Sequence, residues 1–140
     1  GIRFERASGN CPSGTSCARL TFDHSDNPTR LGLEQSAIVL APHSYSLSFY
    51  ARSLDLSTDE GPYLEVIDAT TGRTLASTEA IVGTTPWQRY QQPLLVEEET
   101  RRLLLRLQRR KSLRLDNRLS GTLWLDDFVL EKVIPEEAPR

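Results

Sequence analysis

The sequence predicts an all-β domain built as a two-sheet antiparallel β-sandwich. Short apolar runs alternate with polar residues and are separated by turn clusters at a spacing of roughly ten residues, a pattern typical of strands. No window longer than about a dozen residues keeps apolar positions three and four apart without an intervening β-branched residue, glycine or proline. The length of 140 residues suits one domain with a single core.

The first half of the chain supplies expected strands at 18–23, 33–42 and 44–53. The third of these, "SYSLSFYARS", alternates most cleanly. One face carries Tyr45, Leu47, Phe49 and Ala51, and the other carries Ser46, Ser48, Tyr50 and Arg52. We therefore expect Tyr50 and Arg52 to face solvent.

The middle of the chain predicts a β-hairpin over 62–77, with its turn at Thr71-Gly72, where glycine permits a positive φ. Further strands are expected over 85–100 and 102–110. Segment 96–114 has an alternative as a helix of several turns, because glutamates precede arginines in a leucine-rich stretch. The rest of the chain offers no second helix for it to pack against, so the strand is favoured.

The last expected strand, "SGTLWLDDFVLEKV" at 120–133, places two adjacent carboxylates among apolar residues. Strict alternation assigns Trp124, Asp126, Phe128 and Leu130 to one face, and Leu125, Asp127 and Val129 to the other. The two carboxylates then point apart and do not chelate one ion together. Alternatively, the strand frays at Asp126 and both acids are hydrated or cap loop amides.

Two cysteines, Cys11 and Cys17, flank the turn-forming segment "PSGTS". A disulfide between them would close a short loop and add roughly 2 kcal/mol of stability. Two free thiols remain the main alternative, and a metal or redox role lacks further ligands and the usual spacing. A disulfide would imply export from the reducing cytosol.

Charge is segregated along the chain, although the net charge is only −2. Between Arg101 and Arg118 lie eight Arg or Lys residues and one acid, Asp116. The segment "RRKSLRLDNRLSG" at 109–121 is expected to form a cationic loop. Such a loop is ordinarily just solvated; its functional interpretation is recognition of an anionic polysaccharide, lipid phosphates or membrane headgroups. The negative net charge argues against nucleic acid.

No catalytic constellation emerges from the sequence. The two histidines, His24 and His43, stand in turn-like stretches, and the chain lacks a Gly-x-Ser-x-Gly elbow, a His-Glu-x-x-His helix and a phosphate-binding loop. Asp126 and Asp127 do not suit glycosidase chemistry, which needs two carboxyls flanking one bond. We expect a protein that is not an enzyme.

Several segments in order carry a resemblance to a known family: "FE" at 4–5, "ARLTFD", "LEQSAIVLAP", "YSLSFYARS", "LEVIDATTG", "WQRY", "LLLRL" and "GTLWLDDFVLEKV". Over about residues 3–132 the chain resembles carbohydrate-binding modules of families four, nine and twenty-two, which are jelly rolls of galactose-binding-domain-like topology. The resemblance implies a structural calcium ion with Glu5 and Asp126 among its ligands. It also implies a glycan ligand.

Residues for glycan binding are sought among outward aromatic and polar side chains, because pyranose rings stack on aromatics and their hydroxyls need hydrogen bonds. The candidates are Tyr50, Arg52, Tyr63, Gln88, Tyr90 and Arg106. Trp124 is assigned to neither role. The aromatics expected to pack in the core are Phe4, Phe22, Tyr45, Phe49, Trp87 and Phe128.

These observations together predict a β-sandwich binding module over 1–133, followed by the start of a linker or tail over 134–140. The parent would be a larger exported or envelope protein, placing the domain in the periplasm, on the cell surface or outside the cell. Any membrane anchor of that parent would lie outside these residues. The alternative is a structural or protein-interaction domain on the same fold without a sugar site. The oligomeric state cannot be derived from the sequence.

Overall fold

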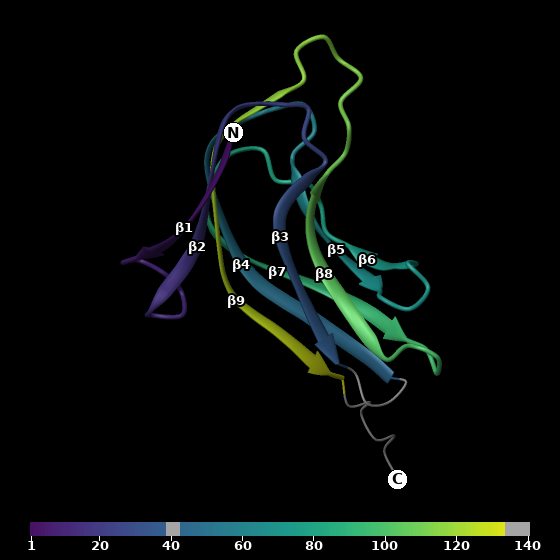
Figure 1. The fold of residues 1–140 in the computed structure, drawn as a ribbon. Helices are drawn as coiled ribbons and strands as arrows, with labels where there is room; N and C mark the ends of the chain where they lie inside the picture. The colour runs from purple at the N-terminus through teal and green to yellow at the C-terminus, as the bar shows by residue number, and fades with distance from the viewer. Residues whose placement is uncertain (39–42, 134–140) are drawn as a thin grey trace.

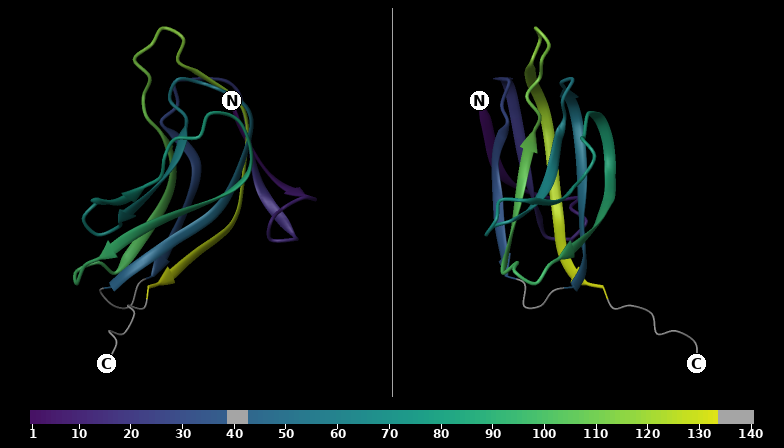
Figure 2. Two further views of the ribbon diagram at one scale, coloured as in Figure 1. Left: turned by 180° about the vertical axis from the view of Figure 1, so that it is seen from behind. Right: turned by 90° about the vertical axis from the view of Figure 1, so that its right-hand side faces the viewer.

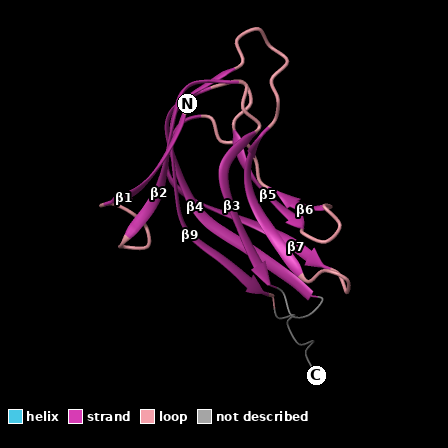
Figure 3. Cartoon of the chain, in the orientation of Figure 1, coloured by secondary structure: helices cyan, strands magenta, loops and turns pink. Residues whose placement is uncertain are grey.

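The computed structural model describes residues 1–38 and 43–133, and there the predicted all-β sandwich is confirmed. The expected tail 134–140 and the end of the expected strand 33–42 lie outside the described residues. Figure 3 shows strands and loops but no helix in the described part. The strands are β1 (Ile2–Ser8), β2 (Ser16–Asp26), β3 (Arg30–Ile38), β4 (His43–Ser57), β5 (Pro62–Asp68), β6 (Thr74–Ser77), β7 (Gly83–Val96), β8 (Arg102–Arg109) and β9 (Arg118–Lys132).

The strands form two antiparallel sheets that face each other (Figures 1 and 2). The five-stranded sheet has the order β1-β2-β9-β4-β7, and the four-stranded sheet has the order β3-β8-β5-β6. The last strand, β9, therefore lies in the middle of the larger sheet, between β2 and β4. Both sheets hide one surface in a common core, as expected for two half-apolar layers.

The core is formed by the inward side chains of both sheets. In β4 these are Leu47, Phe49 and Ala51, as the alternation of that segment predicted. Phe49 stacks on Tyr90 and Phe128 with ring centroids 5.2 Å apart in each pair. Other fully buried members include Leu20, Phe22, Leu31, Leu64, Val66, Val96, Leu103, Leu107, Leu119, Leu123 and Leu125.

The predicted hairpin is confirmed as β5 and β6, with Gly72 at φ +77° in the turn. The helical alternative for 96–114 is wrong. Segment β8 is a strand because β3 and β5 supply its backbone hydrogen bonds on both sides. Its side chains then alternate as a strand requires, with Leu103 and Leu107 buried in the core.

Four β-bulges interrupt the alternation of the five-stranded sheet, three of them at residues with a left-handed backbone and one in β7 between Thr85 and Gln88. One extra residue falls in β2 near His24, one in β4 near Asp55 and one in β9 near Asp127. These three residues adopt left-handed backbone conformations, with φ of 48°, 51° and 56°. Each bulge transfers the following residues to the opposite face of the sheet.

The bulge in β9 corrects the predicted faces of the last strand. Leu123 and Leu125 face the core before the bulge, whereas Phe128 and Leu130 pack against the core after it. Trp124 therefore does not share a face with Phe128. Strict alternation was wrong only after Asp126, because two β4 residue steps, from Ser48 to Tyr50, are matched by three β9 steps, from Val129 to Asp126.

A close backbone approach makes Gly121 of β9 indispensable. Gly121 has a φ of +115°, and a Cβ atom at this position would lie 2.3 Å from the main-chain oxygen of Asp55. That oxygen belongs to the bulge of β4, so it has no freedom to retreat without breaking the pairing of β4 with β9. The two strands meet here only because residue 121 lacks a side chain.

Gly121→Ala should destabilise the domain by about 3 kcal/mol, because it adds a backbone clash to the strain of a positive φ. Gly72→Ala is the matched control: its φ is +77°, but no atom lies within 4 Å of the added Cβ. We expect a loss of about 1 kcal/mol there. Urea unfolding followed by circular dichroism measures both values. Equal losses for the two variants would contradict the close approach.

Candidate functional site

A row of side chains crosses the solvent-facing side of the five-stranded sheet. Arg52 of β4 is in register with Trp124 of β9, Trp124 with Arg19 of β2, and Arg19 with Glu5 of β1. Directly paired residues share one face of a sheet, so these four side chains, the sheet-face row, are neighbours. The row places an aromatic ring between two guanidinium groups.

Contacts within the sheet-face row are specific. The Arg52 guanidinium carbon lies 4.4 Å from the centroid of the Trp124 ring, which is a cation–π arrangement. Arg19 donates from Nη2 to Glu5 Oε2 over 2.9 Å. Tyr50, one of the predicted ligand residues, lies on the same face in register with Arg89 of β7. The predicted outward orientation of Tyr50 and Arg52 agrees with this register.

Below the row, the five-stranded sheet divides. Ala18 and Leu125 are the last register pair of β2 and β9, and beyond them the β1–β2 hairpin turns away from β9 (Figures 1 and 2). A cavity of about 330 Å³ lies at this division, which we call the fork cavity. Its lining includes Phe4, Glu5, Arg6, Gln35, Asp126, Asp127 and Phe128. It thus combines aromatic rings with three carboxylates.

Phe4 was expected in the core, and this prediction was wrong. Its side chain is in register with Leu20 on the inward face of the sheet, yet 56% of the residue is exposed. The reason is topological: β1 is an edge strand of the five-stranded sheet and is paired with β2. The alternation pattern could not predict an exposed Phe4, because it assumes that the inward face of every strand is covered by the opposite sheet.

The predicted disulfide between Cys11 and Cys17 is confirmed. The loop that it closes is fastened to β9, because the Ser13 N–H donates to Asp126 Oδ2 over 2.7 Å. Asp126 is buried, and its adjacent neighbour Asp127 is exposed. The two carboxylates therefore have different surroundings, and the one at Asp126 holds the disulfide loop against the sheet.

The residues expected to bind calcium, Glu5 and Asp126, both line the fork cavity. Their oxygen atoms are engaged by Arg19 and by the Ser13 amide. In residues 1–38 and 43–133, no three His, Cys, Asp or Glu side chains gather as a metal-binding group. Calcium needs six to eight oxygen ligands, so the present side-chain arrangement does not fit the ion without rearrangement of Arg19.

The remaining predicted ligand residues are not part of the sheet-face row. Tyr63 and Arg106 lie on the outer face of the opposite, four-stranded sheet, where Arg110 covers the Tyr63 ring at 4.5 Å and Glu34 pairs with Arg106. Gln88 and Tyr90 share the face of Ala51 and Phe49. Burial raises the pKa of the Tyr90 hydroxyl above its usual value. The six candidates are therefore distributed over three surfaces and form no single site.

The sequence alone left the role of Trp124 undecided, and strict alternation wrongly placed it on the same face as Phe128. A signal for the bulge was present in the sequence, because two aspartates follow Trp124 by two residues. Asp is one of the few non-glycine residues that tolerate the left-handed backbone of a bulge, as Asp127 does here. Trp87, expected to pack, is half-buried, and its indole N–H lacks a hydrogen-bond partner.

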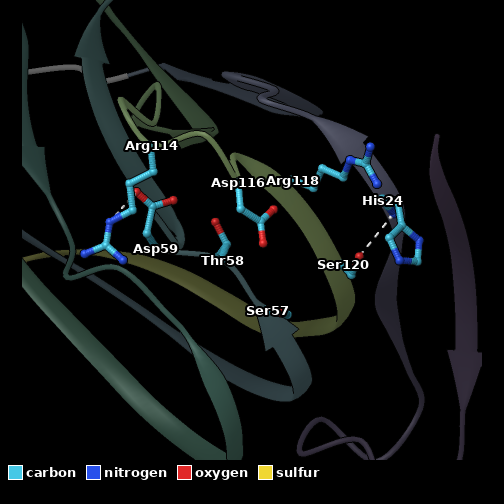
Figure 4. A pocket seen from close by; sticks show the side chains of 8 residues that line it. All are labelled: His24, Ser57, Thr58, Asp59, Arg114, Asp116, Arg118 and Ser120. Carbon is cyan, nitrogen blue, oxygen red and sulfur yellow. Dashed lines mark hydrogen bonds and ion pairs between the residues drawn. The ribbon is translucent and has the colours of Figure 1, made fainter.

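A second, larger hollow of about 580 Å³ lies beneath the loop that joins β8 to β9 (Figure 4). Its lining is polar, and includes Asp59, Arg114, Asp116 and Arg118 but no Phe, Tyr or Trp. The Ser112 hydroxyl, followed by the nearby arginines, keeps the pKa of Asp59 below its usual value. A hollow without an aromatic platform suits a pyranose ring less well than the sheet face.

The same hollow contains a serine and a histidine, but not in a catalytic arrangement. Ser120 Oγ accepts a hydrogen bond from the main-chain N–H of His24 (Figure 4). The imidazole instead lies against Asp23, with Nδ1 at 3.1 Å from Oδ1. A nucleophilic serine would need the ring nitrogen as its base, so this geometry does not activate the hydroxyl.

The basic segment 109–121 was expected to form a loop, but only residues 110–117 do so, because Arg109 ends β8 and residues 118–121 begin β9. Its first arginine is not solvated. The Arg109 side chain has no exposed surface. Its guanidinium donates to the side chains of Thr58 and Asn27 and to the main-chain oxygens of Pro28, Glu60 and Asn117. Arg109 is therefore a structural anchor rather than part of a cationic surface.

Comparison with known proteins identifies the fold. A CBM4 carbohydrate-binding module superposes with a TM-score of 0.64 and 13% identity, covering 95% of this chain and 79% of that one. The CBM22-1 xylan-binding domain from Paenibacillus barcinonensis gives 0.59 and 18%, covering 97% and 84%. The Stig cyclase Fisc from Fischerella sp. TAU gives 0.63 and 16%, covering 97% and 76%. No protein-family model and no curated protein sequence matches the chain.

The jelly roll of the carbohydrate-binding modules, expected from the resemblance, is thus confirmed as the fold. At identities below 25% the likeness concerns the fold alone, and the presence of a cyclase among the neighbours shows that the fold accommodates more than one activity. The described residues contain no helix with the length and apolarity needed to cross a membrane.

Proposed function

We propose that this domain is a noncatalytic glycan-binding module that uses the outer face of the five-stranded sheet. The observation that carries the proposal is Trp124, which lies on this face in register between Arg52 and Arg19. An aromatic ring provides the apolar surface on which a pyranose stacks, and planar guanidinium groups provide the donors for its edge. The carbohydrate-binding modules among the structural neighbours support the proposal.

The charge of the face favours an acidic glycan. Arg19, Arg52 and Arg89 lie on it, and Glu5 neutralises the first of them. A guanidinium group binds a carboxylate with two parallel hydrogen bonds, so a uronic acid residue would be held more strongly than a neutral sugar. Arg52 covers the Trp124 ring in the free domain, and a ligand that displaces it gains both the ring surface and the donors.

Export of the domain is part of the proposal. The Cys11–Cys17 disulfide supports it, because such bonds persist in the periplasm, on cell surfaces and outside cells, whereas the cytosol keeps thiols reduced. A polysaccharide ligand would be met in the same compartments. We infer a parent protein of the envelope or a secreted one.

Calcium bound by Glu5 and Asp126 is the second part of the proposal. Both carboxylates line the fork cavity, which supports it. The ion would take the place of Arg19 at Glu5, and would connect the first strand of the chain with the last. Glu5, Arg19 and Asp126 would then be rearranged together, so the affinities for calcium and for the glycan would be coupled.

A protein-interaction domain without a sugar site is the second candidate, and one observation favours it. All ten aromatic residues lie in the described part of the chain, and Phe4 alone among them is mostly exposed. A sugar platform made from Trp124 requires the displacement of Arg52. If no glycan binds, the same face with its three arginines would suit an acidic protein surface instead.

Glycan binding is tested with a glycan array that includes acidic polysaccharides, followed by calorimetry with the best ligand. Trp124→Ala should weaken binding by about 2 kcal/mol, roughly 30-fold in Kd, because it removes the stacking surface. Tyr50→Ala should weaken it less, since Tyr50 is half-buried beside the row.

A matched pair of arginines provides the control for this experiment. Arg52 covers Trp124 and Arg110 covers Tyr63 at nearly the same distance, 4.4 and 4.5 Å, but on opposite sheets. Arg52→Ala should reduce affinity about tenfold and Arg110→Ala should leave it unchanged. Absence of binding to every glycan on the array would favour the interaction domain.

Calcium binding is tested by thermal unfolding in EDTA and after reloading with calcium. Saturation at about 100 times Kd adds about 2.7 kcal/mol, which should raise Tm by at least about 5 °C. Glu5→Gln and Asp126→Asn should lose this shift, whereas the exposed neighbour Asp127→Asn should keep it. An identical Tm with EDTA and with calcium rules the ion out.

A further inference from the structure

The loop between β8 and β9 presents two leucines entirely to solvent. Leu113 is 97% exposed and Leu115 is 105% exposed, the highest values among the large apolar side chains of the described part. We call residues 110–117 the tip loop. Figures 1 and 2 show that it projects beyond the end of both sheets. Burial of one leucine is worth about 2 kcal/mol, and the fold gains none of this from either side chain.

The tip loop is held in place at both sides of the leucines, so their exposure does not result from fraying. Ser112 is buried: its N–H donates to Asn27 Oδ1 over 2.8 Å and its hydroxyl donates to Asp59 over 2.7 Å. Arg109 binds the main-chain oxygen of Asn117 at the other end of the loop. These contacts fix the base of the loop and direct its tip outward.

Cations surround the two leucines. Arg110, Lys111, Arg114 and Arg118 are exposed, and Asp116 is the single acid within the loop. The Arg110 guanidinium lies over the Tyr63 ring. Arg114 Nε lies 3.7 Å from Asp59 Oδ2, and Arg118 Nε lies 3.7 Å from Asp26 Oδ1. The tip thus combines apolar side chains at its extremity with a cluster of cations behind them, two of which are ion-paired with acids, a distribution typical of interfacial lipid binding.

We propose that the tip loop docks on an anionic lipid bilayer, with Leu113 and Leu115 inserted among the acyl chains and the flanking cations on the lipid phosphates. The shape of the tip favours a bilayer over a protein partner. A stable protein interface buries about 800 Å² on each partner and needs a broad complementary surface, whereas two leucines on a narrow projection offer little such area. A bilayer accepts projecting apolar side chains without a preformed pocket.

The test is co-sedimentation of the domain with large vesicles of phosphatidylcholine alone or with 30% phosphatidylglycerol. Binding should be at least tenfold stronger to the anionic vesicles and should weaken in 0.5 M salt. Leu113→Ser/Leu115→Ser should lose at least tenfold in partitioning. These side chains contact no core, so the variant should keep the wild-type Tm, which circular dichroism verifies.

Two control variants separate insertion of the tip from nonspecific hydrophobic adsorption and from electrostatic attraction alone. Leu95→Ser removes a leucine that is 61% exposed but lies at the opposite end of the sandwich, and it should bind vesicles as the wild type does. Lys111→Glu should weaken binding to anionic vesicles and leave binding to neutral ones unchanged. Absence of binding to anionic vesicles would overturn the proposal and leave a protein partner as the occupant of the tip.

Equal binding by the leucine variant and the wild type would overturn it as well, because the loop would then act as a site for polyanions in general. Dextran sulfate distinguishes this case: a charge-only site binds it with the same affinity in both proteins and with loss in Lys111→Glu. Insertion is confirmed directly if Leu113→Trp shows a blue-shifted emission on vesicles relative to its emission in buffer.

Discussion

The arrangement of the sandwich depends on one extra residue in its central strand. β9 pairs with β2 on one side and with β4 on the other, so its side chains determine what both neighbours face. The bulge at Asp127, with φ of 56°, lets Leu125 before it and Phe128 after it enter the same core. Without the bulge, one half of the strand would direct its apolar residues to solvent. Its position at the end of the β2–β9 pairing also sets where the sheet divides and where the fork cavity opens.

The fold class was accessible from the sequence because period-two alternation reports directly which residues a strand buries. The β4 segment around Phe49 and the hairpin at Gly72 were predicted correctly for this reason. The faces beyond the bulge of β9 were not, because this bulge uses a non-glycine residue, Asp127, in the left-handed region. An aspartate can occupy a bulge or an ordinary strand position, so its presence alone does not reveal the change of face.

Burial of charge was equally hidden from local sequence. Arg109 stands in a run of basic residues and has the same neighbours as an exposed arginine, yet its acceptors come from Asn27, Pro28, Thr58 and Glu60, far away in the chain. Desolvation lowers its pKa from the usual value, and the nearby acids Asp59 and Glu60 oppose that shift. A buried guanidinium whose donors are satisfied in several directions cross-links the loops at one end of the sandwich. For calcium, the sequence correctly placed Glu5 and Asp126 near each other, since both line one cavity. It did not reveal that their carboxylates already bind Arg19 and the Ser13 amide.

The two proposed surfaces are compatible in space, and the direction of β9 relates them. The strand starts at Arg118, beside the tip loop, and reaches Trp124 six residues later, roughly 20 Å along the strand at about 3.3 Å per residue. A domain docked by its tip would hold its strands away from the bilayer, with the sheet-face row directed sideways at that height. A polymer lying above the lipid surface would meet Trp124 and its arginines there while Leu113 and Leu115 stayed inserted. Because Arg52 lies on the five-stranded sheet and Arg110 in the tip loop, loss of one binding activity should leave the other intact, so the surfaces would act as additive contacts on one rigid sandwich.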